Sequence, residues 1–203
     1  YTSVASSVIL VTAHPVLVAP VAHYFLKEKL SLINILGISI SIFGVAVLVL
    51  GNYGLGPLTF EGNILAILGG IAAGLYILGG RRMRKTVSVV SYAFVVYVIA
   101  AVVLFILCIS FNASILNLSL KDYGIIFLMA IISGIFGHTF YNWSLGHIRA
   151  SIASVVLLGE PIGSTLLAYA IPWIQQTPSS YTIVGGFFIL FGIYLTSKNP
   201  IVK

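Results

Sequence analysis

The sequence predicts an all-α polytopic membrane protein with about seven transmembrane helices. Its residues are 60% hydrophobic and only 7% charged, and the mean hydropathy is +1.14. Soluble globular domains contain about 25% charged residues, so this composition excludes an ordinary soluble domain. Apolar runs of about 20 residues, the length that a helix needs to cross roughly 30 Å of hydrocarbon, recur along the whole chain.

These runs predict helices rather than the strands of a membrane barrel, because barrel strands are short and alternate polar with apolar residues. The expected spans are residues 3–26, 32–50, 62–79, 87–111, 123–145, 151–174 and 181–197.

The net charge of +6 arises from Lys and Arg residues that fall on alternate loops. In the predicted topology, Lys121 is alone on one side of the membrane and the nine other Lys and Arg residues lie on the opposite side. The other nine are Lys27, Lys29, Arg81, Arg82, Arg84, Lys85, Arg149, Lys198 and Lys203. Short loops rich in Lys and Arg face the cytoplasm, so we expect a multi-pass protein of the cell (plasma or cytoplasmic) membrane with a cytoplasmic C-terminus. The basic pI then reflects topology and not a nucleic-acid partner, which would require clustered basic and aromatic side chains.

A proline-centred apolar segment occurs twice, at residues 3–25 around Pro15 and at residues 151–173 around Pro161. Each copy is followed by a second apolar run that carries two glycines, and these glycines also align. The aligned pairs are Gly37 with Gly185 and Gly44 with Gly192.

The two copies are inverted with respect to each other. The first ends at Lys27 and the second begins after Arg149, and both of these residues are expected on the cytoplasmic side. Equivalent helices are separated by five spans, which is an odd number, so they cross the membrane in opposite directions. Inverted repeats of this kind are typical of secondary transporters.

Several of these residues resemble the EamA domain of the drug/metabolite transporter superfamily. In the first copy the resemblance lies in Ser6-Ser7, Pro15, the exit from Leu26 to Ser31, Gly37 and Gly44, and in the second in Arg149-Ala150-Ser151, Glu160-Pro161, Gly185 and Gly192. Lys27 departs from the pattern, because the family usually has a small residue before the acidic one.

The resemblance implies a fragment of a ten-helix fold built from two inverted five-helix repeats. Residues 1–50 would be the last two helices of the first repeat and residues 51–203 the complete second repeat, with about three helices upstream. It also implies a secondary carrier of small metabolites such as amino acids, working by alternating access, with efflux as the direction implied by analogy. We expect a small-molecule substrate, no cofactor and no metal.

Glu160 and His14 immediately precede the two prolines and occupy equivalent positions in the two copies. A carboxylate inside a membrane is costly and is a functional candidate by default. Glu160 therefore predicts proton coupling or recognition of a substrate ammonium, against the alternative of a neutral acid that bonds a neighbouring helix. His14 is a substrate-binding or coupling candidate too, although a buried neutral imidazole often has a structural role only.

The two prolines also predict helix kinks with unpaired carbonyl groups. Proline has no N–H to donate four residues back, so Leu157 before Pro161 and Val11 before Pro15 each lose a helical partner. A freed carbonyl needs another donor or a wet cavity, and either a binding site or a packing kink satisfies this requirement.

A further polar stripe is expected on the fifth span. His138, Tyr141 and Asn142 are spaced by three and four residues, one turn after Gly134, so an α-helix places them on one face. They line a solvated pathway or bond a neighbouring helix. Two weaker lining candidates are Tyr76 and Tyr92.

Glycine pairs at a spacing of four predict close helix packing. The pairs are Gly70 with Gly74 and Gly159 with Gly163.

Two other functions compete with a carrier. An intramembrane enzyme would use His14, His138 and Glu160 as metal ligands, but the chain lacks His-Glu-x-x-His and Gly-x-Ser-x-Gly. The second alternative is a passive channel, which flux measurements would distinguish.

Overall fold

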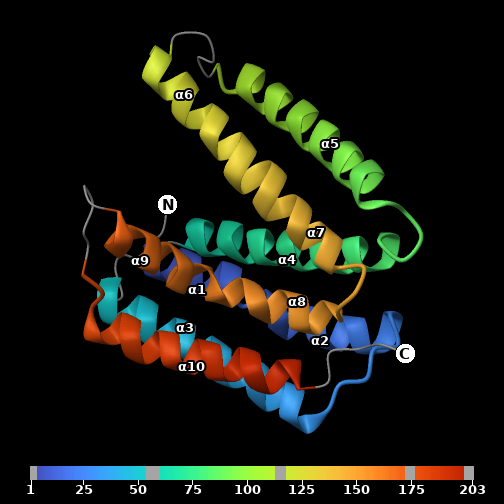
Figure 1. Ribbon diagram of the computed structural model, residues 1–203, viewed down its shortest axis with the longest axis vertical. Coiled ribbons are helices and arrows are strands. Elements are labelled where there is room, and N and C mark those ends of the chain that lie inside the picture. Colours follow the sequence, from blue (N-terminus) through green and yellow to red (C-terminus); the bar gives the residue numbers. More distant parts are fainter. Residues whose placement is uncertain (1–3, 54–59, 113–117, 172–176, 199–203) are drawn as a thin grey trace. The chain divides into compact units, whose positions relative to one another are not determined.

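The computed structural model describes residues 4–53, 60–112, 118–171 and 177–198. These residues form helices joined by loops, with no strand among them, and seven of the resulting helical segments are long and apolar enough to cross a membrane (Figure 1). The predicted all-α polytopic fold is therefore confirmed.

Each expected span corresponds to one helical segment, two of which are broken at proline and one by a π-helix. The elements are α1 (Val4–Thr12), α2 (His14–Phe25), α3 (Leu32–Tyr53), α4 (Phe60–Met83), α5 (Val89–Ser110), α6 (Leu120–Met129), η1 (Ala130–His138), α7 (Thr139–Ser144), α8 (Ala150–Val156), η2 (Leu157–Gly159), α9 (Glu160–Ala170) and α10 (Ser180–Ser197). The expected ends at residues 3 and 172–174 lie outside the described residues.

The chain divides into two compact units. The first unit comprises Tyr1–Gly79 and Ile148–Lys203, and the second unit comprises Gly80–His147. The first unit holds both proline-broken helices and both glycine-bearing helices, so it contains all the repeated elements.

The centre of the first unit is the antiparallel pair α3 and α10, which lie side by side along their length (Figure 1). Their glycines meet: a Cβ on Gly44 would lie 2.6 Å from the carbonyl oxygen of Gly185, and a Cβ on Gly185 would lie 2.6 Å from that of Gly44. Gly37 and Gly192 oppose each other in the same way. Small residues let the two backbones approach this closely.

Buried aliphatic side chains surround this pair. They come from α2, α3, α8, η2 and α10, and they are Ala19, Ile38, Val45, Leu48, Val49, Val155, Leu158 and Ile189. The core is thus built by the repeated helices themselves.

The Gly70–Gly74 seam is confirmed. A Cβ on Gly70 would lie 2.9 Å from the Leu10 carbonyl oxygen, and one on Gly74 would lie 2.8 Å from a methyl group of Leu17. Helix α4 therefore packs on the first proline-broken helix and runs in the same direction.

The prediction that Gly159 and Gly163 form a close helix-packing seam is wrong. A Cβ on Gly159 would meet only a methyl group of Ile193, at 3.5 Å, and one on Gly163 would meet nothing within 4 Å. The reason is that no backbone of another described helix approaches this side of α9, so the spacing of the glycines has no partner to serve.

Candidate functional site

Both proline-broken helices break where the sequence predicts, and each freed carbonyl has found a donor. The His14 ring Nδ1 donates to the Val11 carbonyl oxygen at 3.1 Å. In the second copy the 3-10 turn η2 tightens the helix, so that the main-chain N–H of Glu160 donates to the Leu157 carbonyl. The same proline problem is solved by a side chain in one copy and by backbone rearrangement in the other.

His14 lies in a helix interface. It is only 7% exposed, and its ring lies between the main chains of Val11 and Ser154, the latter on α8. Its Nε2 atom is buried without a hydrogen-bonding partner among the described residues. The ring therefore has one structural bond and one unused nitrogen, and its role in binding or coupling stays a prediction.

Glu160 lies instead at a cavity of about 430 Å³ between α1 and α9. Nothing among the described residues pairs with its carboxylate, and the side chain is exposed. Besides Glu160 the cavity is lined by Ser7, Val8, Val11, Thr12, Leu48, Val49, Leu157, Pro161 and Ser164. The predicted kink and the predicted carboxylate are thus brought together on one cavity wall.

A second cavity of about 470 Å³ adjoins the first and shares Leu48, Pro161 and Ser164 with it. Its lining is more polar, because hydroxyl and amide side chains of α3, α9 and the start of α10 face it. The remaining lining residues are Asn52, Thr165, Ala168, Thr177, Pro178, Ser179 and Thr182. The sequence patterns did not single out these polar residues, because they come from separate helices.

The two ends of the first unit differ. At one end, which we call the basic end, the loop after α2 carries Lys27 and Lys29 and meets the start of α8. At the other, which we call the far end, Ser179 donates to Asn52 at 2.6 Å. The second cavity, which adjoins the one beside Glu160, reaches the far end at these two residues.

Two hydrogen bonds close the basic end. The Glu28 carboxylate accepts from the main-chain N–H of Ala150 at 2.8 Å, and Arg149 Nη1 donates to the Lys29 carbonyl at 2.6 Å. Glu28 is 3% exposed and Arg149 5% exposed. The sequence analysis used Arg149 as a marker of topology and Glu28 as part of a family motif. Both residues belong to the motif segments of the two copies, and this shared membership was the signal that could have predicted their contact.

In the second unit the polar stripe is interrupted by a π-helix. The nine residues of η1 make i to i+5 turns, which α-helical spacing does not predict, and Tyr97 of α5 donates to the Gly134 carbonyl at 2.9 Å. His138 is exposed, whereas Asn142 is fully buried. These two residues therefore differ in burial, Tyr141 is intermediate, and a role for the stripe in lining a pathway stays a prediction.

Two arginines fix the end of α7 in this unit. Arg81 Nη1 donates to the Leu145 carbonyl at 2.9 Å, and Arg84 Nε donates to the Asn142 carbonyl at 3.1 Å. Carbonyl groups at a helix C-terminus lack helical donors, so these arginines satisfy them. Asn142 is held through its main chain, and a role for its side chain in substrate binding stays a prediction.

The two tyrosine candidates are half-buried. Tyr76 lies on α4 within the first unit. Tyr92 lies on α5, with its hydroxyl 3.0 Å from where a Cβ on Gly80 would be. The candidates thus divide between the units: Glu160, His14 and Tyr76 in the first, and Tyr92, His138, Tyr141 and Asn142 in the second. Among the residues that the structure describes, no three His, Cys, Asp or Glu side chains are grouped as metal ligands.

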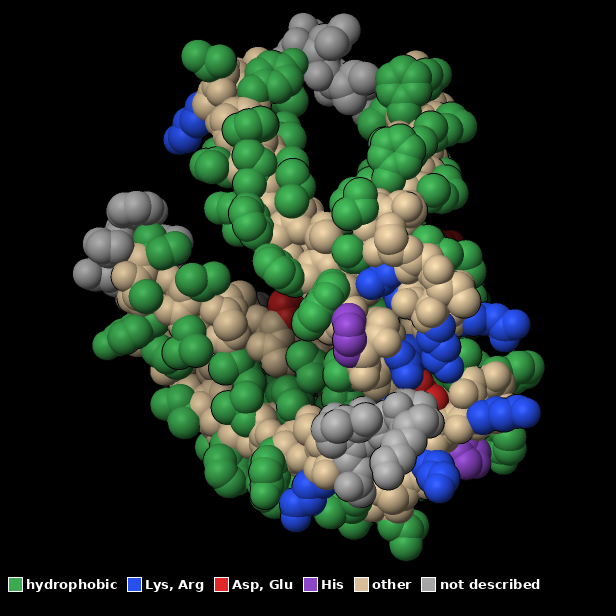
Figure 2. Space-filling view, turned by 45° about the vertical axis from the view of Figure 1, so that its right-hand side comes forward, with side chains coloured by type: hydrophobic (Ala, Val, Ile, Leu, Met, Phe, Trp, Pro, Cys, Tyr) green, Lys and Arg blue, Asp and Glu red, His purple; other side chains and the backbone are tan. Residues whose placement is uncertain are grey.

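The outer surface of the helices is apolar. Figure 2 shows hydrophobic side chains along the helices, as expected for helices in contact with lipid, together with a group of Lys and Arg side chains. Apolar spanning helices, an inverted repeat and a polar cavity at broken helices are together the features of a membrane transport protein.

The comparisons with known proteins give the family. The model of the EamA-like transporter family matches residues 60–198. The chain therefore belongs to this family, as the sequence resemblance predicted.

Relatives match over nearly the whole chain. The uncharacterized transporter YyaM of Bacillus subtilis (strain 168) is 25% identical over 97% of this chain and 65% of its own length. An uncharacterized transporter of Archaeoglobus fulgidus is 24% identical over 98% of this chain and 70% of its own length. A protein of known crystal structure superposes with a TM-score of 0.76 at 19% identity, covering 96% of this chain and 67% of that one, and shows the same fold.

Proposed function

We propose that this protein is a secondary carrier that exports small metabolites, amino acids or related compounds, across the cytoplasmic membrane by alternating access. Its C-terminus and the basic end of the first unit face the cytoplasm in this proposal. Membership of the EamA-like transporter family supports transport, and the excess of Lys and Arg at the basic end supports the orientation.

The observation that carries alternating access is a broken symmetry in the first unit. The repeat relates α1 and α2 to α8 and α9, and α3 to α10. Packing of α1 on α3 has its image in the packing of α8 on α10, and both are present. Helix α2 packs on α8 at the basic end. The symmetry-equivalent contact would be α9 on α1 at the far end, but there the cavity beside Glu160 separates the two helices.

A repeat that is closed at one end and open at the other describes one state of a two-state carrier. Exchanging the conformations of the two copies would open the basic end and close the far end, so that the same cavity faces the other compartment. In this proposal the structure represents the state open to the outside.

The cavity residues then have distinct roles. Glu160 is the substrate-binding or coupling group, Pro15 and Pro161 are the points at which the helices bend, and His14 lies where the second copy has its carboxylate. The remaining candidates are proposed to line the transport pathway; they are Tyr76, Tyr92, His138, Tyr141 and Asn142.

Two sequence-equivalent positions test the exchange. Ser164 lines the cavity on α9, and its equivalent on α2 is the fully buried Val18. We would label Ser164→Cys and Val18→Cys, each in a Cys108→Ser background, with an impermeant thiol reagent in proteoliposomes. Alternating access predicts that outside reagent labels position 164, and that conditions which slow this labelling speed labelling of position 18 from the inside.

Counterflow of amino acids in the same proteoliposomes tests transport itself. Saturable uptake that is accelerated by internal substrate is the expected result. Flux that never saturates, with both cysteines reactive at once, would instead identify a passive channel.

A further inference from the structure

We propose that the two adjoining cavities form a site selective for organic cations, that is, for solutes with an ammonium group and a net positive charge. This inference rests on the proposed carrier function and narrows its substrate class. Among amino acids and related compounds, the site favours those with a net positive charge over zwitterions and anions.

The charge of the lining is the first argument. Among the described residues that line the two cavities, Glu160 is acidic and there is no Lys, Arg or His. Its carboxylate has no partner among those residues, so its charge is not neutralised within the site. A bound cation supplies the missing partner, whereas a bound anion adds a second negative charge beside the first.

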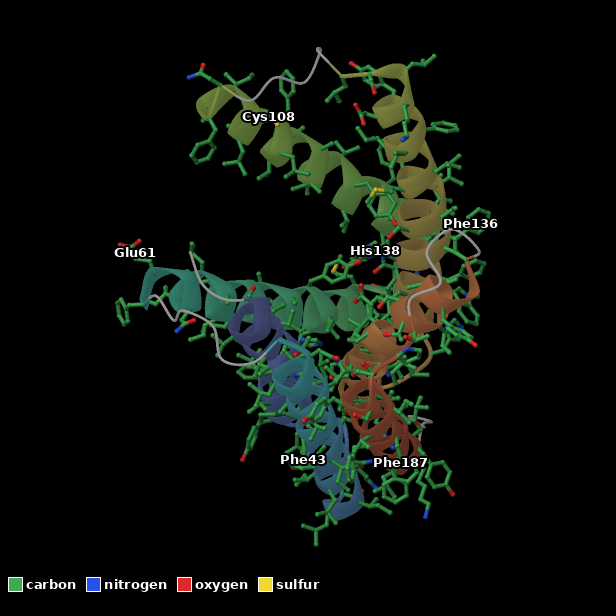
Figure 3. All side chains as sticks on the ribbon, turned by 90° about the vertical axis from the view of Figure 1, so that its left-hand side faces the viewer. Phe43, Glu61, Cys108, Phe136, His138 and Phe187 are labelled. Carbon is green, nitrogen blue, oxygen red and sulfur yellow. The ribbon has the colours of Figure 1, made fainter. Side chains whose placement is uncertain are left out.

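The distribution of charge along the first unit acts in the same direction. Lys27, Lys29 and Arg149 lie at the basic end. The acidic Glu61 lies in the first turn of α4, at the end of that helix (Figure 3), and lines neither cavity. No described Lys or Arg lies at the far end of this unit, so nothing at the mouth of the cavities attracts an anion.

The hydroxyl groups of the site provide a second and independent argument. Thr12 Oγ1 donates its hydrogen to the Val8 carbonyl at 2.6 Å. Ser164 and Thr165 donate theirs to the Pro161 carbonyl, at 3.0 and 2.7 Å. Each of these hydroxyls has therefore used its one hydrogen on the backbone, and retains lone pairs only.

The polar end of the site repeats this pattern. Ser179 Oγ donates to the Asn52 side-chain oxygen at 2.6 Å, and the Asn52 amide nitrogen donates to the Leu48 carbonyl and to the Thr182 hydroxyl. The donors in these bonds are consumed inside the protein. These residues and Glu160 leave a ligand a carboxylate and hydroxyl lone pairs, whereas the hydroxyls of Ser7 and Thr177, which also line the cavities, donate no hydrogen bond among the described residues.

Such a lining complements a donor better than an acceptor. An ammonium group has three N–H donors and no acceptor, so it suits the lone pairs and the Glu160 charge together. The carboxylate of a zwitterion would meet the Glu160 charge, with few hydroxyl donors such as Ser7 and Thr177 to bind it. Affinity should therefore fall from cation to zwitterion to anion.

A matched series of four-carbon probes tests this order. The probes are 4-amino-1-butanol as the cation, 4-aminobutyrate as the zwitterion and 4-hydroxybutyrate as the anion, each titrated against the purified protein at pH 7 with the thermal unfolding midpoint as readout. A ligand that binds only the folded protein raises this midpoint, and at a fixed ligand concentration the rise grows with the logarithm of the affinity. We expect 4-amino-1-butanol to raise it and 4-hydroxybutyrate to leave it unchanged.

Two carboxylate variants assign the effect to the cavity. Glu160→Gln should weaken binding of 4-amino-1-butanol by about tenfold or more, as expected when a hydrogen bond to a charged group is lost. Glu61→Gln removes the same charge outside the cavities and should leave the affinity unchanged. Glu160→Asp keeps the charge, and its partial retention of binding separates a charge effect from misfolding.

Equal stabilisation by all three probes, or full retention of cation binding in Glu160→Gln, would overturn the inference. The outcome is separable from that of the carrier proposal. If positions 164 and 18 are labelled reciprocally but the three probes stabilise the protein equally, the carrier proposal stands and the cation selectivity fails. If cations bind but the labelling rates of positions 164 and 18 never change, the alternating-access proposal fails and the charge preference of the cavity stands.

Discussion

Ser41 donates a hydrogen bond to the carbonyl oxygen of Ile189 at 3.2 Å, and these two residues occupy equivalent positions in the two copies of the repeat. A residue that contacts its own equivalent lies on the two-fold axis that relates the copies. The glycine contacts on either side agree, because the pair Gly37–Gly192 is the image of the pair Gly185–Gly44. This is the self-complementary pattern of a two-fold interface, here within one chain.

The symmetry predicts that equivalent glycines have equal importance. Gly44→Ala and Gly192→Ala each place a methyl group against the backbone of the facing helix, and overpacking of this kind costs about 1–3 kcal/mol. We expect similar losses for the two variants in the free energy of unfolding, measured by denaturant titration in detergent.

Gly163→Ala is the matched control for these substitutions. Its new methyl group meets nothing within 4 Å, and alanine is the better helix former by about 1 kcal/mol. This variant should be as stable as the parent or more so. A loss of stability as large as that of Gly44→Ala would contradict the packing described for α3 and α10.

Glu28→Gln should loosen the basic end. The amide retains an acceptor oxygen for the Ala150 N–H, but it loses the charge that strengthens this buried bond, and hydrogen bonds to charged groups are worth about 1.5–3 kcal/mol. We expect faster labelling of Val18→Cys from the side of the basic end. Unchanged labelling would show that Glu28 does not hold α2 and α8 together, and Glu61→Gln is the control for charge alone.

Lys27→Gly should stabilise the protein. Lys27 has a φ of 55°, in the left-handed region, where a residue with a side chain is disfavoured by about 1–2 kcal/mol and glycine is not. The gain is reduced by the greater chain entropy of glycine in the unfolded state, so we expect a net rise of about 1 kcal/mol in the free energy of unfolding. Lys29→Gly, which adds the same flexibility at a neighbouring position outside this region of φ, should not stabilise.

Sequence patterns predict well what depends on neighbouring residues in the chain. The spans follow from runs of apolar residues, the breaks at Pro15 and Pro161 follow from the missing N–H, and the alignment of the glycines anticipates the contact of α3 with α10. Glu160 was singled out by the cost of a charge in lipid, and it lines the cavity.

Patterns fail where the partner is distant or the helix is irregular. The bond from Arg149 to the Lys29 carbonyl spans 120 residues, and no local spacing encodes it. The π-helix η1 was missed because the 3.6-residue period was assumed throughout. Gly163 has the right spacing but no facing backbone, so a small-residue motif alone does not identify a seam.

His14 separates a structural role from a functional one. His14→Ala removes the donor to the Val11 carbonyl and leaves a buried acceptor unpaired, which costs about 1–3 kcal/mol. His14→Asn keeps a side-chain donor but cannot titrate near neutral pH, so it should retain most of the stability. If the ring serves only as a donor to the Val11 carbonyl, transport by His14→Asn will match the parent at every pH. If the ring also couples protons, the folded variant will lose the pH dependence of transport between about pH 5 and 8, where an unperturbed histidine changes charge. Unfolding titrations of both variants, together with counterflow across that pH range, decide between the two roles because stability and pH dependence are then measured on the same protein.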